Sequence, residues 1–297
     1  MTERATTRLR KLLAEPGLVI APGVADALNA RLVAQAGFEA IYMTGSGTSV
    51  GRLGMPDIGL LTLSEMADNA GRIADASGLP LISDADTGYG GPINVQRTVR
   101  MFEKAGVAGI HIEDQTWPKR CGHLSGKTLI PKDEMVAKVR AACDARHDAD
   151  FVIIARTDAI AVAGLEAALE RAEAYAEAGA DLTFVESPRT PEELAAPPQR
   201  LKVPNLFNMA SSGKTPFLSK NEIEALGYKL AIYPNFAMLC AVPVVRNYLF
   251  ELKTKGTVAH LVNEMASFRE LFEIAGMEEV RELEAKYAVD ETSRVDF

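Results

Sequence analysis

Eight short apolar segments recur along the chain, and stretches with helical spacing separate them. Each segment is rich in Val, Ile, Leu or Phe and is bounded by Gly, Pro or polar residues, which is typical of a strand buried on both faces. The segments cover residues 18–21, 40–43, 79–83, 109–112, 151–155, 182–185, 203–207 and 230–233. Strands that alternate with helices in this way predict an α/β fold, a (β/α)8 barrel (TIM barrel).

An open doubly wound sheet is the alternative fold, but no Gly-x-Gly-x-x-Gly motif opens the first helix. The expected helix N-caps include Asp26, Ser64 and Asn94. Residues 236–297 continue the helical pattern without another strand, with predicted helices at 236–250, 258–274 and 278–287. We therefore expect one barrel domain over residues 1–297, with the helical region 236–297 used for packing between subunits.

The composition narrows the classes of partner. A net charge of −8 and a pI near 5.2 argue against nucleic acid or an anionic membrane surface. No stretch approaches the roughly 18 apolar residues of a membrane span, and the start of the chain has no apolar signal segment. Three cysteines without paired spacing favour a reducing cytoplasm. An acidic enzyme with an anionic substrate must concentrate its positive charge locally, in a metal ion or a few arginines.

Polar residues follow every predicted strand. In a barrel these positions converge on one mouth, so their chemistry indicates an enzyme. In chain order they are Asp26, residues 42–44, Asp84 and Asp86, Glu113 and Asp114, Arg156 and Asp158, Glu186, Asn208 and Tyr233. Two long segments, 44–62 and 114–131, also follow strands at this face, and long irregular loops are usually functional or mobile.

Four carboxylates suggest a cation site. Asp84 and Asp86 are two residues apart in an extended segment, so both side chains are expected to face the same way. With Glu113 and Asp57 they could hold Mg²⁺, which keeps several waters and needs only one or two direct carboxylates. The alternative is that these carboxylates cap helices or pair with Arg156. No Cys/His cluster has the spacing of a zinc site.

A thiol lies among cations in the second long loop. Lys119, Arg120 and His123 surround Cys121 in sequence, and they would stabilise its thiolate and lower its pKa. Such a thiol can transfer a proton to a carbanion or attack a carbon. A rim thiol without a chemical role is the alternative. The single tryptophan, Trp117, precedes this motif, and His111 lies inside the fourth strand, where a core role is expected.

Five motifs resemble the isocitrate lyase/phosphoenolpyruvate mutase superfamily. They are Asp-Ala-Asp-Thr-Gly-Tyr-Gly at 84–90, His-Ile-Glu-Asp-Gln at 111–115, Lys-Arg-Cys-Gly-His at 119–123, Ala-Arg-Thr-Asp-Ala at 155–159 and Gly-Lys-Thr-Pro at 213–216. The resemblance runs over nearly the whole chain. It implies a barrel whose last helix is swapped between subunits, usually in a homotetramer. It also implies Mg²⁺ or Mn²⁺, and a loop near 117–131 that closes over the substrate.

The resemblance also assigns roles by position. The implied metal residues are Asp57, Asp84, Asp86 and Glu113, and the implied contacts to a substrate carboxylate are Thr44, Gly45, Ser46, Arg156 and Asn208. Cys121 would protonate the leaving enolate. Tyr42 is a candidate for proton transfer, Glu186 lines the site, and Lys119, Gly122 and His123 accompany the cysteine.

The departures from the superfamily pattern narrow the reaction. Phosphonate mutases of this superfamily lack the cysteine and carry Asn in that loop, so Cys121 favours carbon–carbon over phosphorus–carbon chemistry. Methylisocitrate lyases hold a third carboxylate with side chains that align here with Leu239, Phe268 and Ser211, while Phe236 would add an apolar wall. We therefore expect a Mg²⁺-dependent lyase acting on a 2-hydroxy dicarboxylate such as 2,3-dimethylmalate. The alternatives are 2-methylisocitrate lyase, oxaloacetate hydrolase, phosphonate chemistry and a scaffold without catalysis.

Overall fold

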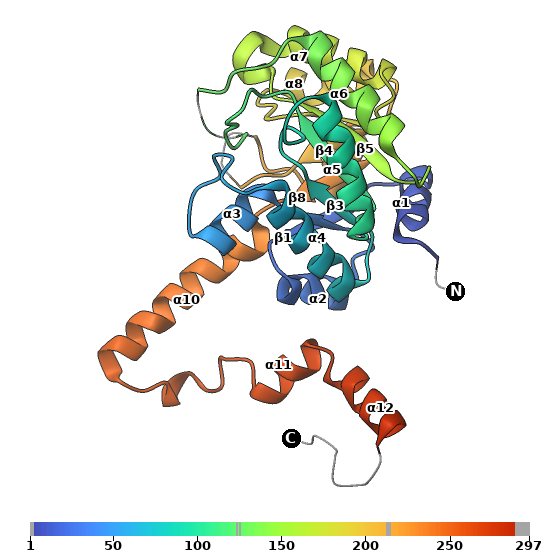
Figure 1. Cartoon of the computed structure of the whole chain (residues 1–297). Coiled ribbons are helices and arrows are strands. Elements are labelled where there is room, and N and C mark those ends of the chain that lie inside the picture. Colours follow the sequence, from blue (N-terminus) through green and yellow to red (C-terminus); the bar gives the residue numbers. More distant parts are fainter. Residues whose placement is uncertain (1–2, 123, 125, 212–214, 289–297) are drawn as a thin grey trace. The chain divides into compact units, whose positions relative to one another are not determined.

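The computed structural model describes residues 3–122, 124, 126–211 and 215–288. Eight parallel strands form a closed barrel in chain order, and β1 pairs with β8 to close it (Figure 1). The strands are β1 (Val19–Val24), β2 (Ile41–Met43), β3 (Leu81–Asp84), β4 (Gly109–Glu113), β5 (Val152–Thr157), β6 (Leu182–Val185), β7 (Asn205–Asn208) and β8 (Leu230–Tyr233). The predicted (β/α)8 barrel is confirmed, because every predicted apolar segment overlaps a strand.

Helices connect the strands and continue after the last one. They are α1 (Ala5–Ala14), α2 (Ala27–Gln35), α3 (Gly45–Leu53), α4 (Leu63–Ser77), α5 (Pro92–Lys104), α6 (Lys132–Ala145), α7 (Ile160–Glu177), α8 (Pro191–Arg200), α9 (Lys220–Ala225), α10 (Phe236–Lys255), the 3₁₀ helix η1 (Ala259–Leu261), α11 (Phe268–Ile274) and α12 (Met277–Tyr287). None of the helices in the described part of the chain combines the length and apolar character that crossing a membrane requires.

Apolar side chains fill the barrel and close one of its ends. Ile82, Ile154 and Phe184 belong to one buried cluster together with Leu9 of α1, and none of these side chains is exposed. Helix α1 therefore packs across the amino-terminal ends of the strands. With that end occupied, the polar residues at the carboxyl ends are left to form the functional face, as is usual in this fold.

The chain divides into two compact units, residues 1–238 and residues 239–297. The first contains the whole barrel, and the second contains η1, α11, α12 and most of α10. The predicted helix 258–274 is wrong over its middle, since the backbone there is helical only in η1 and α11. Ser267 accepts a hydrogen bond from the backbone of Glu270 and so begins α11 as a cap.

Two of the three predicted N-caps are also wrong. Asp26 caps α2 by accepting a hydrogen bond from the backbone of Asn29, as expected. Helix α4 is capped by Thr62 rather than Ser64, and helix α5 by Gly91 rather than Asn94. In both helices the side chain three positions after the cap accepts a hydrogen bond from the backbone N–H of the cap residue: Glu65 from Thr62, and Asn94 from Gly91. For α5, the prediction therefore took this acceptor, Asn94, for the cap itself.

The cap of α4 gives a test of this assignment. Thr62→Ala should lower the free energy of unfolding by about 1 kcal/mol, because it removes both hydroxyl contacts with Glu65. The matched change Ser64→Ala, at an exposed position in the same turn, should stay within about 0.5 kcal/mol of the unaltered protein. Urea denaturation measures both values. Equal losses in the two variants would contradict the assignment.

Candidate active site

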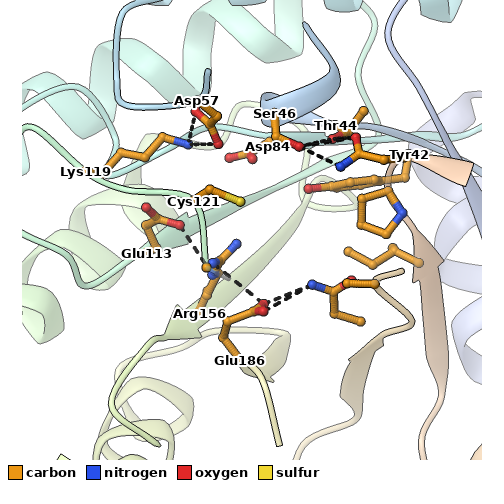
Figure 2. Close-up of a pocket in the computed structure, with 16 residues that line it drawn as sticks. Tyr42, Thr44, Ser46, Asp57, Asp84, Glu113, Lys119, Cys121, Arg156 and Glu186 are labelled. Atoms are coloured by element: carbon orange, nitrogen blue, oxygen red, sulfur yellow. Dashed lines mark hydrogen bonds and ion pairs between the residues drawn. The ribbon is translucent and has the colours of Figure 1, made fainter. Parts of the chain in front are cut away.

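The carboxyl ends of the strands and the loop after β4 enclose one small cavity of about 50 Å³. Most of the predicted site residues line it: Tyr42, Thr44, Ser46, Asp57, Asp84, Glu113, Lys119, Cys121, Gly122, Arg156, Glu186 and Asn208 (Figure 2). They come from six strand ends and two loops that are far apart in sequence. The barrel therefore brings together the side chains that the sequence singled out.

A few predicted residues lie elsewhere. Phe236 does not line this cavity. Its side chain is 57% exposed and borders a separate apolar pocket with Pro22, Leu32 and Tyr233. The physical reason is that β8 ends at Tyr233 and Phe236 opens α10, where its side chain turns toward α2. Ser211 is exposed and is not among the lining residues, and His123 lies outside the described residues.

Asn235 lines the cavity just after β8, although it was not among the predicted site residues. Its Oδ1 accepts hydrogen bonds from the hydroxyls of Thr44 and Ser46, each at 3.2 Å. Its Nδ2 also donates to Ser46 Oγ at 2.9 Å. The signal that could have found it is its place directly after a strand, which it shares with the other site residues.

The amino-terminal end of helix α3 forms one wall of the cavity. Thr44 caps this helix by accepting a hydrogen bond from the backbone of Gly47 at 3.2 Å. Backbone N–H groups at a helix start attract anions. Gly45, the first helical residue, lies so close to β3 that a Cβ there would be 2.3 Å from Asp84 Oδ2. Glycine at this position therefore lets the helix start abut the carboxylate.

Asp84 and Asp86 do not alternate along a strand as predicted. Strand β3 ends at Asp84, and Asp86 has a φ of 48°, a left-handed conformation that is uncommon for a residue other than glycine. Asp84 lines the cavity, whereas Asp86 does not and pairs with Lys119. The prediction that both side chains face the same way was wrong because the extended backbone ends between Asp84 and Asp86.

Lys119 forms ion pairs with both Asp57 and Asp86. Its side chain is only 2% exposed, and its Nζ lies 2.7 Å from Asp57 Oδ1 and 2.6 Å from Asp86 Oδ1. Burial raises the pKa of Asp86 to about 6, and the neighbouring Asp84 and Asp57 add to the rise against the attraction of Lys119. The charge of Lys119 is thus balanced by the carboxylates of Asp57 and Asp86.

Arg156 is the centre of a second charged group. Its guanidinium makes a bidentate contact with Asp158, at 3.0 and 3.2 Å, and lies 3.3 Å from Glu113 Oε2. It also lies 3.6 Å from Glu186, which accepts hydrogen bonds from Asn208. Pairing with Arg156, which the sequence offered as the alternative to a metal-binding role for the carboxylates, is therefore observed for Glu113. Burial raises the pKa of Glu113 well above its usual range in spite of this pairing.

Cys121 is carried into the cavity by its loop. The backbone N–H of Cys121 donates to the carbonyl of Asp57 at 3.2 Å, and its sulfur points into the cavity (Figure 2). Gly122 follows so closely on the opposite wall that a Cβ would lie 2.4 Å from Arg156 Nη2 and 2.9 Å from Glu186 Cδ. The thiol is thus placed between the carboxylate of Asp84 at the end of β3 and the guanidinium of Arg156 on β5.

Tyr42 and His111 form a buried pair behind Asp84. The phenol oxygen lies 2.8 Å from His111 Nε2, and the two rings are stacked. Burial lowers the pKa of His111 to about 4, and it raises the pKa of Tyr42 well above its usual value, with Asp84 adding to the rise. Both groups are therefore neutral near pH 7. His111 is fully buried and does not line the cavity, as its expected core role requires.

A family model described as phosphoenolpyruvate phosphomutase matches residues 9–253. The chain belongs to this family. It is 46% identical over 281 residues to 2,3-dimethylmalate lyase of Eubacterium barkeri, covering 95% of this chain and 97% of that protein. It is 42% identical to the chloroplastic carboxyvinyl-carboxyphosphonate phosphorylmutase of Arabidopsis thaliana (97% and 86%) and 42% identical to 2-methylisocitrate lyase of Aeropyrum pernix (96% and 91%).

Solved structures agree with this membership. A crystal structure of 2,3-dimethylmalate lyase, described as a member of the PEP mutase/isocitrate lyase superfamily, superposes with a TM-score of 0.94 at 40% identity over the whole of both chains. Oxaloacetate acetylhydrolase in complex with 3,3-difluorooxalacetate superposes with a TM-score of 0.92 at 40% identity, covering 97% and 98% of the two chains. The predicted resemblance is confirmed.

The acidic side chains around the cavity are paired with cationic side chains, and this pairing bears on whether they fit a divalent cation. Within the described residues no three His, Cys, Asp or Glu side chains converge to enclose an ion, because Lys119 separates Asp57 from Asp86 and Arg156 holds Glu113. Asp86 Oδ1 is buried, and its neighbour is the ammonium group of Lys119 at 2.6 Å. Carboxylate oxygens of this kind fit a hard cation that keeps most of its waters.

Helix α3 provides a matched test of the cavity wall. Gly45→Ala should destabilise the protein by about 1–3 kcal/mol, because the new Cβ would overlap the Asp84 carboxylate. Gly51→Ala in the same helix meets only ordinary contacts at 3.7 Å or more, so it should stabilise by about 0.5–1 kcal/mol. Thermal unfolding compares the two. Shifts of the same sign would contradict the described approach of α3 to Asp84.

Proposed function

We propose that this chain is a divalent-metal-dependent carbon–carbon lyase that cleaves a 2-hydroxy dicarboxylate resembling 2,3-dimethylmalate. The products are an α-keto acid such as pyruvate and a carboxylate. The observation that carries the proposal is the thiol of Cys121 pointing into a cavity lined by Asp84 and Arg156. The curated lyases among the relatives confirm the predicted class of enzyme, a carbon–carbon lyase acting on an oxo-acid precursor.

Positive groups at the cavity bind the substrate carboxylates. Arg156 presents a fixed, buried guanidinium, which suits bidentate contact with a carboxylate. The start of α3 adds backbone N–H groups and the hydroxyls of Thr44 and Ser46, which Asn235 orients. Asn208, held by Glu186, supplies a further amide. Together they hold the substrate next to Asp84.

Asp84, with Asp57, Asp86 and Glu113 around it, would hold Mg²⁺ or Mn²⁺. When bound, such an ion lowers the pKa of a coordinated hydroxyl and offsets developing negative charge. Arg156 stabilises the charge that develops on the leaving enolate from the other side of the cavity. As the substrate hydroxyl loses its proton to solvent and becomes the carbonyl of the α-keto acid, the C2–C3 bond breaks. Cys121 donates its thiol proton to C3 of the resulting enolate, which leaves a thiolate. Tyr42 acts as a neutral hydrogen-bond donor, because its raised pKa keeps the phenol protonated.

The lining of the cavity supports a substrate with two carboxylates. Ala210, Ile232 and Pro234 are among the lining residues, and they offer apolar contact to an alkyl group. Arg156 is the one arginine among the described lining residues, and it already meets three protein carboxylates. Burying a third substrate carboxylate without a fixed cation would cost several kcal/mol. A 2-methylisocitrate lyase and an oxaloacetate hydrolase remain the rival activities.

The proposal extends to assembly. Several apolar side chains of α10 and α11 are exposed in the single chain, among them Leu249 (60%), Phe250 (67%) and Phe268 (66%). Large exposed apolar side chains on neighbouring turns mark interaction surfaces. We propose a homo-oligomer in which residues 236–297 pack against another copy, in a tetramer built as a dimer of helix-swapped dimers.

A substrate panel tests the activity. With Mg²⁺ present, the protein should release an α-keto acid from 2,3-dimethylmalate faster than from 2-methylisocitrate or citramalate, and oxalate release from oxaloacetate is measured in parallel. Cys121→Ser should lower kcat by about 10²–10⁴-fold, because general-acid catalysis contributes that much. Cys143→Ser, a thiol of α6 that is outside the cavity lining, serves as the matched control. Absence of Mg²⁺-dependent turnover on all four compounds would refute the proposal.

The raised pKa of Asp86 gives a pH test of the metal site. Below about pH 6 Asp86 holds a proton in the absence of metal, so a cation must displace that proton in order to bind. Mg²⁺ affinity should therefore be full above this pH and fall by up to about tenfold per unit below it. Asp86→Asn should weaken binding and flatten the dependence. If calorimetry gives the same Kd for Mg²⁺ at about pH 5 and about pH 7, Asp86 is not part of the metal site.

A further inference from the structure

Lys127 lies in the same loop as Cys121, and the proposed chemistry gives it no role. Its side chain is 2% exposed, and its Nζ makes two contacts from this buried position. It donates to Asp158 Oδ1 at 2.7 Å and to the backbone carbonyl of Gly122 at 2.5 Å. A buried ammonium is costly unless it is paired, so these contacts fix where the loop can lie.

Asp158 is shared between Lys127 and Arg156. Its Oδ1 accepts from both Lys127 Nζ and Arg156 Nη2, and its Oδ2 accepts from Arg156 Nε. The backbone N–H of Asp158 donates to Asp114 Oδ1 at 3.0 Å, which anchors this carboxylate to the end of β4. One continuous set of contacts therefore runs from the carbonyl of Gly122 through Lys127 and Asp158 to the guanidinium.

We propose that Lys127 is a positioning residue that sets the Cys121–Gly122 backbone relative to Arg156, acting through the carboxylate of Asp158. Gly122 leaves no room for a Cβ against Arg156, so a small movement of the loop would change both the thiol position and the guanidinium position. The contacts that join Gly122, Lys127, Asp158 and Arg156 are observed in the structure. Its effect on turnover rests on the proposed function, in which Cys121 and Arg156 act on the same substrate.

Lys127→Met tests the link with two readouts. Trypsin cleavage after Arg120, followed by mass spectrometry without any substrate, should become about tenfold faster as the loop loses its anchor. The kcat/KM of the active enzyme should fall about 100-fold, as expected for misplaced reacting groups. Lys132→Met, an exposed lysine just after the loop, is the matched control and should change neither. Cleavage and kcat/KM both within about twofold of the unaltered protein would overturn the proposal, as would faster cleavage with unchanged kcat/KM.

A double-mutant cycle separates positioning from a general structural role. If Lys127 acts through Asp158, adding Asp158→Asn to Lys127→Met should lower kcat/KM by no more than about threefold beyond the worse single variant. Losses that multiply would overturn the proposal. Should circular dichroism show that Lys127→Met is unfolded, Lys127→Gln takes its place in both assays. If the unaltered protein turns over none of the substrates, the proposed function fails, and the cleavage assay still decides whether Lys127 anchors the loop.

Discussion

A surplus of buried acidic side chains over cations at the mouth of the barrel is the constraint on which the site depends. Among the described residues there, Asp84, Asp86, Glu113, Asp158 and Glu186 are buried, against the three cations Lys119, Lys127 and Arg156. The loop after β4 carries both lysines, so its position and the charge balance of the mouth are set together. Because unpaired buried ions are costly, the loop packs into the mouth with Cys121 between its two lysines.

The strands supply fixed groups, and the backbone just after them is strained where it serves the site. Asp86 and Ser187 both have φ values in the left-handed region, at 48° and 59°, directly after β3 and β6. Ser187 donates to Glu186 at 2.7 Å, so its conformation helps to hold a side chain of the cavity. Strained residues of this kind persist where the surroundings determine them, and they cluster at functional sites. The rigid barrel therefore presents carboxylates and a guanidinium, and the loop adds the acid.

The barrel could be predicted because its signal is local: each buried strand is a short apolar run, and each is followed by a polar residue. The cavity lining followed from that rule together with the family motifs. The failures concern interactions that sequence spacing does not encode. The end of β3 between Asp84 and Asp86, the turn of Phe236 toward α2, and the hydrogen bonds of Asn235 all depend on tertiary packing. Lys127 went unnoticed because its partner, Asp158, is 31 residues away.

In the proposed mechanism a divalent cation and the substrate's carboxylate meet between Asp84 and Arg156, with Cys121 beside them. A crystal structure of the protein with Mg²⁺ and oxalate, which resembles the enolate of an α-keto acid, tests this most directly. We expect the ion next to Asp84 and one oxalate carboxylate between the start of α3 and Arg156, with the Cys121 sulfur facing the ligand. Oxalate bound elsewhere, or a cavity free of metal at saturating Mg²⁺, would rule out this arrangement.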